Sequence, residues 1–210
     1  MPFIQIQNQR VLFVHIPKTG GSSVTRWMQD LGRVRLHGNT KPEGLKVTSQ
    51  HLTWTDIDAM WGCDDFDYVF TVVRNPFTRM ASEFGMRQKL REQGFFGGSM
   101  HFPSWLERAL IDTRNNANHF DNHIRPQWTF ISDRMRVFRF EDGMETILRA
   151  VSADLGLPAP ASVPHMLSSA DPQRAPLTWD RGDILRMREF YQQDFEQFGY
   201  DIEPLESQPE

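Results

Sequence analysis

The chain has 210 residues, of which 39% are hydrophobic and 24% charged, a balance typical of a globular domain with a substantial core and not of a disordered chain. Its net charge of −4 offers no general attraction for nucleic acid, so a site for an anionic ligand needs a local concentration of positive groups. The single cysteine, Cys63, excludes an intrachain disulfide bond.

No stretch of the sequence approaches the roughly 18 apolar residues that span a membrane. The first ten residues lack both a basic leader and a long apolar core. We therefore expect a soluble, cytoplasmic protein without a transmembrane segment, while an anchor upstream of Met1 and the oligomeric state stay open. No internal repeat or linker is visible, which favours one domain over residues 1–210 with a frayed tail from about residue 203.

The most informative stretch is Val11–Ser23, which reads VLFVHIPKTGGSS. Its apolar part does not alternate with polar residues, as expected for a strand of a parallel sheet that is covered on both faces. Pro17 ends this strand, and Gly20 and Gly21 allow backbone angles and a close ligand approach that a β-carbon would prevent. A helix is expected to follow as far as about Leu31. Three residues are candidates for its cap: Thr19, Ser22 and Ser23.

The start of this helix is a candidate anion site. The first N–H groups of a helix have no partner within it, and together with the helix dipole and the ammonium group of Lys18 they favour a phosphate or sulfate group. The alternative interpretation is an ordinary turn between a strand and a helix, with a solvated lysine.

A second apolar run, Tyr68–Val73, predicts another central strand, and Arg74 stands at its carboxyl end. Parallel strands end at the same edge of a sheet, where open α/β folds bind ligands. We therefore expect Arg74 to lie near the Lys18 turn, where its guanidinium group can make a bidentate contact with phosphate. The alternative is an arginine that only forms a salt bridge.

Asn75 and Pro76 supply a cap and a first-turn proline for a helix that should reach about Arg91. Ser82 lies about 140° around this helix from Phe77, which places it off the expected buried face and lets its hydroxyl join Arg74 at a ligand. That buried face is expected to hold Phe77, Met80, Ala81 and Phe84.

The remaining elements are expected in alternating order. Helices are predicted over residues 53–60, 103–111, 142–155 and 182–198, a third strand over residues 135–140, and loops over residues 32–50, 94–102 and 157–176. Strands that alternate with helices predict an α/β fold with a central, mostly parallel sheet flanked by helices.

Residues 112–127 are too rich in Arg, Asn and His to form a core. His119 and His123 are four residues apart with Asp121 between them, a spacing that would put two metal ligands on one face of a helix. No further ligand motif accompanies them, so no metal site is expected.

The two turns together resemble those of sulfotransferases that use 3′-phosphoadenosine 5′-phosphosulfate (PAPS). HIPKTGGSS at His15–Ser23 is similar to their 5′-phosphosulfate loop, and RNPFTRMAS at Arg74–Ser82 is similar to their 3′-phosphate motif. DNHIRPQ at Asp121–Gln127 is similar to a segment of carbohydrate sulfotransferases of the heparan 2-O and chondroitin type. The resemblance runs from residue 11 to about residue 201. It departs at Asn75, where many relatives have aspartate.

The resemblance implies a P-loop-like sulfotransferase fold and transfer of a sulfuryl group from PAPS to a hydroxyl of a carbohydrate or similar small acceptor. It implies that Lys18 also stabilises the leaving phosphate and that Arg74 and Ser82 hold the 3′-phosphate. No metal is required, because a sulfuryl group carries less negative charge than a phosphoryl group. The residues implied for the 5′-phosphosulfate are Lys18, Thr19, Gly20, Gly21, Ser22 and Ser23.

An acceptor hydroxyl also needs a base. His51 is the candidate, because an imidazole titrates near neutrality and because SQHLTW is similar to the catalytic-histidine segment of 2-O-sulfotransferases. The alternative is a histidine with a surface or hydrogen-bonding role. His123, Arg125 and Gln127 are expected to orient the acceptor or the 3′-phosphate side of the cleft, unless they form a polar surface loop.

Two other functions stay open. A nucleotide or small-molecule kinase would also use a strand, a phosphate loop and a helix, but the loop has its lysine before the glycines and does not spell GxxxxGK[ST]. A non-catalytic nucleotide-binding protein would keep the cleft and lack the base.

Overall fold

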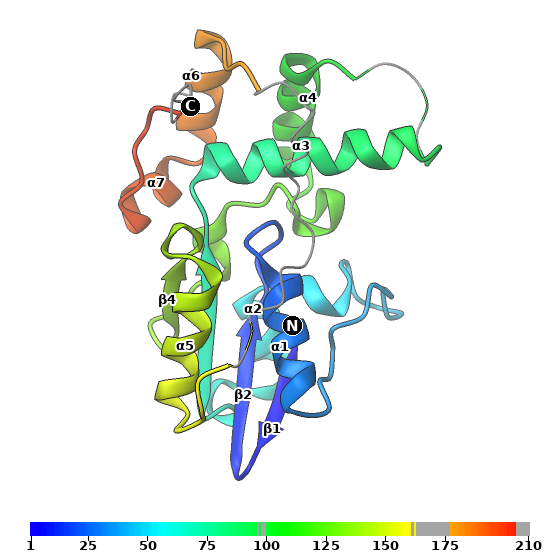
Figure 1. The fold of residues 1–210 in the computed structure, drawn as a ribbon. Helices are drawn as coiled ribbons and strands as arrows, with labels where there is room; N and C mark the ends of the chain where they lie inside the picture. Colours follow the sequence, from blue (N-terminus) through cyan, green and yellow to red (C-terminus); the bar gives the residue numbers. More distant parts are fainter. Residues whose placement is uncertain (96, 98–99, 161, 163–176, 205–210) are drawn as a thin grey trace.

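The computed structural model describes residues 1–95, 97, 100–160, 162 and 177–204, and shows an α/β fold built on one sheet (Figure 1). Within this part of the chain the sheet has four strands in the order β1-β2-β3-β4. β2 pairs with β3 and β3 with β4 in parallel, whereas β1 is antiparallel to β2. The predicted mostly parallel sheet is therefore confirmed. The strands are β1 Phe3–Ile6, β2 Gln9–Val14, β3 Tyr68–Val73 and β4 Arg136–Arg139.

The two central strands lie where the apolar runs predict them. The last four residues of β2 and the last five of β3 are buried, as expected for strands covered on both faces. β1 was not predicted. It has four residues and forms a hairpin with β2 through a turn at Gln7, whose φ of 52° lies in the left-handed region.

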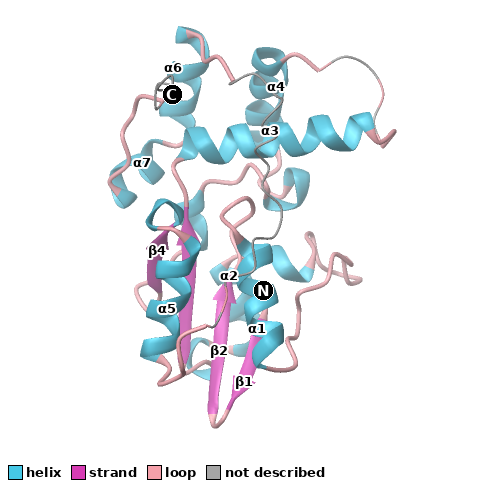
Figure 2. Ribbon diagram, in the orientation of Figure 1, coloured by secondary structure: helices cyan, strands magenta, loops and turns pink. Residues whose placement is uncertain are grey.

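Helices cover both faces of the sheet and its carboxyl edge. α1 and α5 pack on one face around Phe13, Phe70 and Val72, and α2, α3, α4, α6 and α7 share a second core with Leu12, Val14 and Val73. Figure 2 shows α3 running across the carboxyl ends of the strands. The helices are α1 Gly21–Leu31, α2 Trp54–Trp61, α3 Pro76–Glu92, α4 Phe102–Asn115, α5 Met144–Asp154, α6 Arg181–Phe190 and α7 Gln192–Phe198.

The last predicted helix is in fact two helices. The helical conformation is interrupted at Tyr191, which has φ −109° and ψ 21° and lies between α6 and α7. Tyr191 is buried, and its hydroxyl donates a hydrogen bond to the carbonyl of Ile124 at 2.5 Å. The apolar residues keep a helical period throughout residues 182–198, so the sequence pattern alone does not indicate this interruption.

The predicted cap of α3 is confirmed, whereas that of α1 is not. Asn75 caps α3 by accepting from the N–H of Phe77 at 2.9 Å, and Thr53 forms a capping box with Asp56 at the start of α2. The predicted side-chain cap of α1 is wrong. Gly20 occupies that position with φ 88° and makes no side-chain cap bond.

Parts of three predictions lie outside the described residues. These are the loop over residues 94–102, the loop over residues 157–176 and the tail beyond residue 203. Among the described helices, none combines the length and apolar character needed to cross a membrane.

Candidate active site

The two predicted turns meet at the carboxyl edge of the sheet. One Nη atom of Arg74 donates to the carbonyl of Lys18 at 3.2 Å, and its Nε donates to the Thr78 hydroxyl at 3.0 Å. The guanidinium group lies over the Phe140 ring, 4.4 Å from the centroid. The arginine is therefore fixed between the loop after β2 and the first turn of α3.

Close packing leaves no room for a side chain at the two glycines of the first turn. A β-carbon on Gly21 would lie 1.9 Å from Nε2 of His15, so the buried imidazole occupies the space that any side chain would need. Gly20, at φ 88°, would place a β-carbon 2.5 Å from Cε of Met144. The backbone at the start of α1 is thus held close to its neighbours, with the N–H groups of the first helical turn at the sheet edge.

Lys18 occupies an unusual position in this turn. Its φ of 69° lies in the left-handed region, which is uncommon for a residue with a β-carbon and occurs preferentially at functional sites. Burial lowers the pKa of its ammonium group, while the nearby carboxylate of Glu83 raises it. Of the serines that follow, Ser22 is exposed and Ser23 is buried.

Arg79, which the sequence did not single out, joins the turn to the 123–125 segment. Its side chain is 1% exposed. Nε donates to the carbonyl of Pro17 at 3.0 Å, and one Nη donates to the carbonyls of His123 and Arg125 at 2.8 and 3.1 Å. Arg79 therefore holds two loops together through their backbones.

His51 lies at the end of a short 3₁₀ turn, Ser49–His51, and its Nδ1 is 2.7 Å from Oδ2 of Asp121. Burial lowers the pKa of His51 to about 4, and the hydrogen bond to Asp121 only partly opposes this. Burial would raise the pKa of Asp121, but hydrogen bonds from His51 and Thr48 hold it at about 2. At neutral pH a neutral imidazole therefore donates from Nδ1 to an ionised carboxylate, which leaves Nε2 as a proton acceptor.

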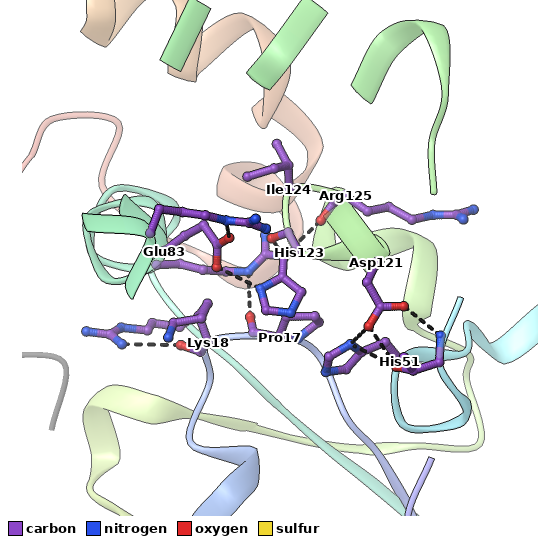
Figure 3. Close-up of polar contacts among 12 residues, drawn as sticks. Pro17, Lys18, His51, Glu83, Asp121, His123, Ile124 and Arg125 are labelled. Atoms are coloured by element: carbon purple, nitrogen blue, oxygen red, sulfur yellow. Dashed lines mark hydrogen bonds and ion pairs between the residues drawn. The ribbon is translucent and has the colours of Figure 1, made fainter. Parts of the chain in front are cut away.

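His123 forms a second pair of the same kind. Its Nδ1 is 2.7 Å from Oε2 of Glu83, and Arg87 donates to the other oxygen of that carboxylate at 2.8 Å. Burial would raise the pKa of Glu83, but His123, Arg87 and Lys18 lower it to about 2. The His51 and His123 rings meet edge to face, with centroids 4.9 Å apart. Figure 3 shows the two imidazoles side by side, each with its own carboxylate.

The structure contradicts the idea that His119 and His123 are metal ligands on one helix face, but it brings together another set of possible metal ligands. His119 and His123 do not share a helix face, because Phe120, Asp121 and Asn122 all have positive φ. His51, Asp121 and His123 do offer donor atoms within 4.8 Å of one another. However, both oxygens of Asp121 already accept hydrogen bonds from Thr48 or His51, so the carboxylate is committed to the imidazole and the loop.

Two predicted site residues lie differently from expectation. Gln127 is fully buried, and its amide both donates to the carbonyl of Arg74 and accepts from its N–H, so it holds the end of β3 instead of facing an acceptor. Ser82 is 7% exposed, so its predicted place off the buried face is wrong. α3 is buried on the side of Arg79 and Glu83 as well as on its apolar side. Ala81, expected to be buried, is only partly so.

Arg125 keeps its side chain near the surface of the same region. Its Nε donates to the Thr129 hydroxyl at 3.0 Å, and one Nη donates to Asn118 at 3.4 Å. Burial lowers the pKa of its guanidinium group, with Asp56 opposing.

A hollow of about 690 Å³ borders the His51–Asp121 pair. It includes Thr48 and Asp121 themselves, and two lysines supply positive charge. The lining residues are Lys41, Lys46, Thr48, Asn116, Asn118, His119, Phe120 and Asp121. Ammonium, amide and hydroxyl groups thus surround a space beside the candidate base.

Comparisons with known proteins give one clear result. A search of curated proteins finds no match. Residues 1–201, however, match the family described as "Sulfotransferase family". Since this match includes both turns, both histidine–carboxylate pairs and nearly all of the chain, the protein belongs to the sulfotransferase family.

Proposed function

We propose that this protein transfers the sulfuryl group of PAPS to a hydroxyl of a carbohydrate or similar small acceptor, with His51 as the base and Lys18 beside the leaving phosphate. Family membership supports sulfuryl transfer in general. The observation that carries the finer proposal is the His51–Asp121 pair, a neutral imidazole bound through Nδ1 and located at the same sheet edge as Lys18.

The donor turn fits a nucleotide with phosphates at both ends of its ribose. The glycine backbone at the start of α1, the half-buried Lys18 and the first-turn N–H groups suit a phosphosulfate, whereas Arg74 is fixed one loop away for a separate phosphate. Thr19 contributes only its backbone, because its hydroxyl donates to the carbonyl of Ile16 at 2.8 Å. The proposed donor set is Lys18, Thr19, Gly20, Gly21, Ser22, Ser23, Arg74 and Ser82.

PAPS, when bound, supplies an activated sulfuryl group on a phosphate leaving group. His51 Nε2 takes the proton of the acceptor hydroxyl as the acceptor oxygen forms its bond to sulfur. The bond between sulfur and the phosphate oxygen breaks, and its electron pair stays on that oxygen, where Lys18 and the helix N–H groups offset the charge. Asp121 then stabilises the imidazolium. None of these steps requires a metal ion.

The hollow beside His51 supports a polar acceptor. Its lysine, asparagine and threonine side chains can bind several hydroxyl groups, and Phe120 offers an apolar surface to a sugar ring. His123 and Arg125 lie next to this region and are proposed to orient the acceptor. Gln127 is left out of this set, because its amide is used on the backbone of Arg74.

Calorimetry with adenosine 3′,5′-bisphosphate tests the donor site. Lys18→Ala and Arg74→Ala should each weaken binding by at least about tenfold, since each removes a charge-assisted contact. Lys89→Ala, an exposed lysine in the last turn of α3, is the matched control and should bind normally. Unchanged affinity in both site variants would sink the donor assignment. Stronger binding of ATP with Mg²⁺ than of the bisphosphate would favour a kinase instead.

A transfer screen with labelled PAPS over sugars, glycolipids and phenols tests the acceptor class. Transfer to a sugar hydroxyl is expected, and it should be lost in His51→Ala while bisphosphate affinity is kept. Bisphosphate binding without transfer to any acceptor would point to a non-catalytic nucleotide-binding protein. Transfer to phenols alone would contradict the carbohydrate assignment.

A further inference from the structure

A second hollow, of about 650 Å³, lies at the β1 edge of the sheet. Its lining combines three arginines with three aromatic rings and one carboxylate. The lining residues are Phe3, Ile4, Gln5, Arg10, Arg33, Arg35, Trp61, Asp65 and Phe66. None of the proposed donor, base or acceptor residues is among them, so this hollow is separate from the candidate active site.

Strand geometry places the three arginines on one face. Ile4 and Ile6 of β1 are buried in the core beneath α1, so Gln5 points to the opposite face. Arg10 is paired with Gln5 in the β1–β2 ladder and therefore shares that opposite face.

The segment after α1 runs alongside β1 and extends the same face of the sheet. Arg35 exchanges backbone hydrogen bonds with Phe3, at 2.9 and 3.1 Å, in an antiparallel bridge. Val34 is buried in the core that holds Ile4, so its neighbours Arg33 and Arg35 point away from that core, as Gln5 does. The guanidinium groups therefore come from the two segments that flank β1, with Arg10 on β2 and Arg33 and Arg35 on the segment after α1, and all three line one hollow.

The charges in this hollow are only partly compensated. Arg10 is 3.7 Å from Asp65, in an ion pair whose side chains are 52% and 42% exposed. Among the described residues, Arg33 and Arg35 form no ion pair, and both are exposed. Three guanidinium groups thus face a single lining carboxylate, in a protein whose net charge is −4. Such a local excess attracts oxyanions, which guanidinium groups bind in a bidentate manner.

Aromatic rings form the wall of the hollow. Phe3, Trp61 and Phe66 pack edge to face against one another, with ring centroids 6.3, 5.7 and 6.5 Å apart. Trp61 remains 36% exposed, although a large apolar side chain normally buries more of its surface. An exposed indole beside guanidinium groups offers a ring on the ligand a surface to stack on, while the cations bind its charged group.

We propose that this hollow is a second binding site, separate from the donor site, for a sulfate or phosphate ester carried on a sugar or aromatic ring. The arginines bind the oxyanion and Trp61 contacts the ring. The proposal does not depend on the proposed function, because it would hold for any chemistry at the carboxyl edge of the sheet.

Calorimetry of the full chain tests the proposal with four probes: glucose 6-sulfate, glucose 6-phosphate, glucose and inorganic sulfate. Both esters should bind, glucose should not, and inorganic sulfate should bind more weakly because it has no ring. The double variant Arg33→Ala and Arg35→Ala should weaken ester binding by at least about tenfold. Trp61→Ala should weaken binding of the esters but not of inorganic sulfate. The preference between the two esters identifies the natural source of the oxyanion.

Two controls separate this site from general electrostatics and from the donor site. Arg149→Ala removes an exposed arginine on α5 that pairs with Glu145, and should leave ester binding unchanged. Lys18→Ala should also leave it unchanged. Equal binding of glucose and its esters, full affinity in the double variant, or loss of binding in Lys18→Ala would each overturn the proposal. Thermal unfolding of each variant confirms that these exposed substitutions leave the fold intact.

Discussion

Replacement of Asp121 by asparagine is the sharpest perturbation of the proposed base. Oδ1 of Asp121 accepts from the N–H of Thr48 at 2.6 Å, and Oδ2 faces Nδ1 of His51 at 2.7 Å. An asparagine that keeps the bond from Thr48 presents its NH₂ group to His51. The imidazole must then accept at Nδ1 and carry its proton on Nε2, the nitrogen that should take the acceptor proton.

The magnitude follows from what the substitution removes. A hydrogen bond to a charged group contributes about 1.5–3 kcal/mol, which alone corresponds to a loss of roughly 10- to 150-fold in rate. The wrong tautomer removes the base as well, and general-base catalysis contributes about 100- to 10,000-fold. We therefore expect Asp121→Asn to lower kcat by about 100-fold or more. Affinity for adenosine 3′,5′-bisphosphate should stay unchanged, because Asp121 does not line the donor turn.

The assay is sulfate transfer from labelled PAPS to the best acceptor of the screen, with calorimetry for the nucleotide. Asp112→Asn is the matched control, because Asp112 also lies near a histidine, 3.8 Å from His119, but outside the pair at His51. It should keep full turnover. Normal turnover in a folded Asp121→Asn protein would refute the assignment of His51 and Asp121 as a catalytic unit.

Three further predictions concern stability and are checked by denaturant unfolding. Gly21→Ala should cost about 1–3 kcal/mol, because its methyl group collides with His15, whereas Gly38→Ala, whose β-carbon would meet nothing closer than 3.9 Å, should be neutral. Glu83→Gln should cost about 3–5 kcal/mol, since it leaves the partners of a buried carboxylate uncompensated, and a cost below about 1 kcal/mol would contradict that view of the pair with His123. The pKa of His51 is about 4 in the folded protein and 6.5 when unfolded, so protons bind the unfolded state preferentially between these values. The free energy of unfolding should therefore fall by about 3 kcal/mol as the pH falls from above 6.5 to 4. His51→Gln should flatten that part of the pH dependence, and an unchanged slope would show that the loss arises elsewhere.

The parts of the fold that the sequence predicted are those governed by local patterns. β2 and β3 are continuous apolar runs because both faces are covered, and such runs are visible without knowledge of the partner strand. The start of α3 was also visible, since Asn75 and Pro76 satisfy local rules for caps. β1 was missed because four residues are too few to establish a period.

Only the part of the candidate site that depends on local sequence patterns could be predicted. The glycines and cations of the two turns are read directly from their spacing, and the structure brings Arg74 to the Lys18 carbonyl. Asp121 and Glu83 were missed as partners of the histidines, because they pair across 70 and 40 residues. The one sequence feature that could have indicated such a partner is Glu83, an acidic residue near cations in the middle of α3. The structure buries it against the site.

The missed residues explain how loops can hold the geometry of the proposed active site. His51 and His123 lie outside the strands and the longer helices, so neither gains its position from a backbone ladder. Instead, Asn122 donates from its side chain to the carbonyl of His51 at 2.8 Å, and Arg79 donates to the carbonyl of His123 at 2.8 Å. Because Arg79 projects from α3 and also binds the carbonyl of Pro17, one helix fixes the donor turn and one imidazole together. A change at Arg79 should therefore disturb the turn that carries Lys18 and the position of His123 together, whereas the proposed base His51 is held separately through Asn122.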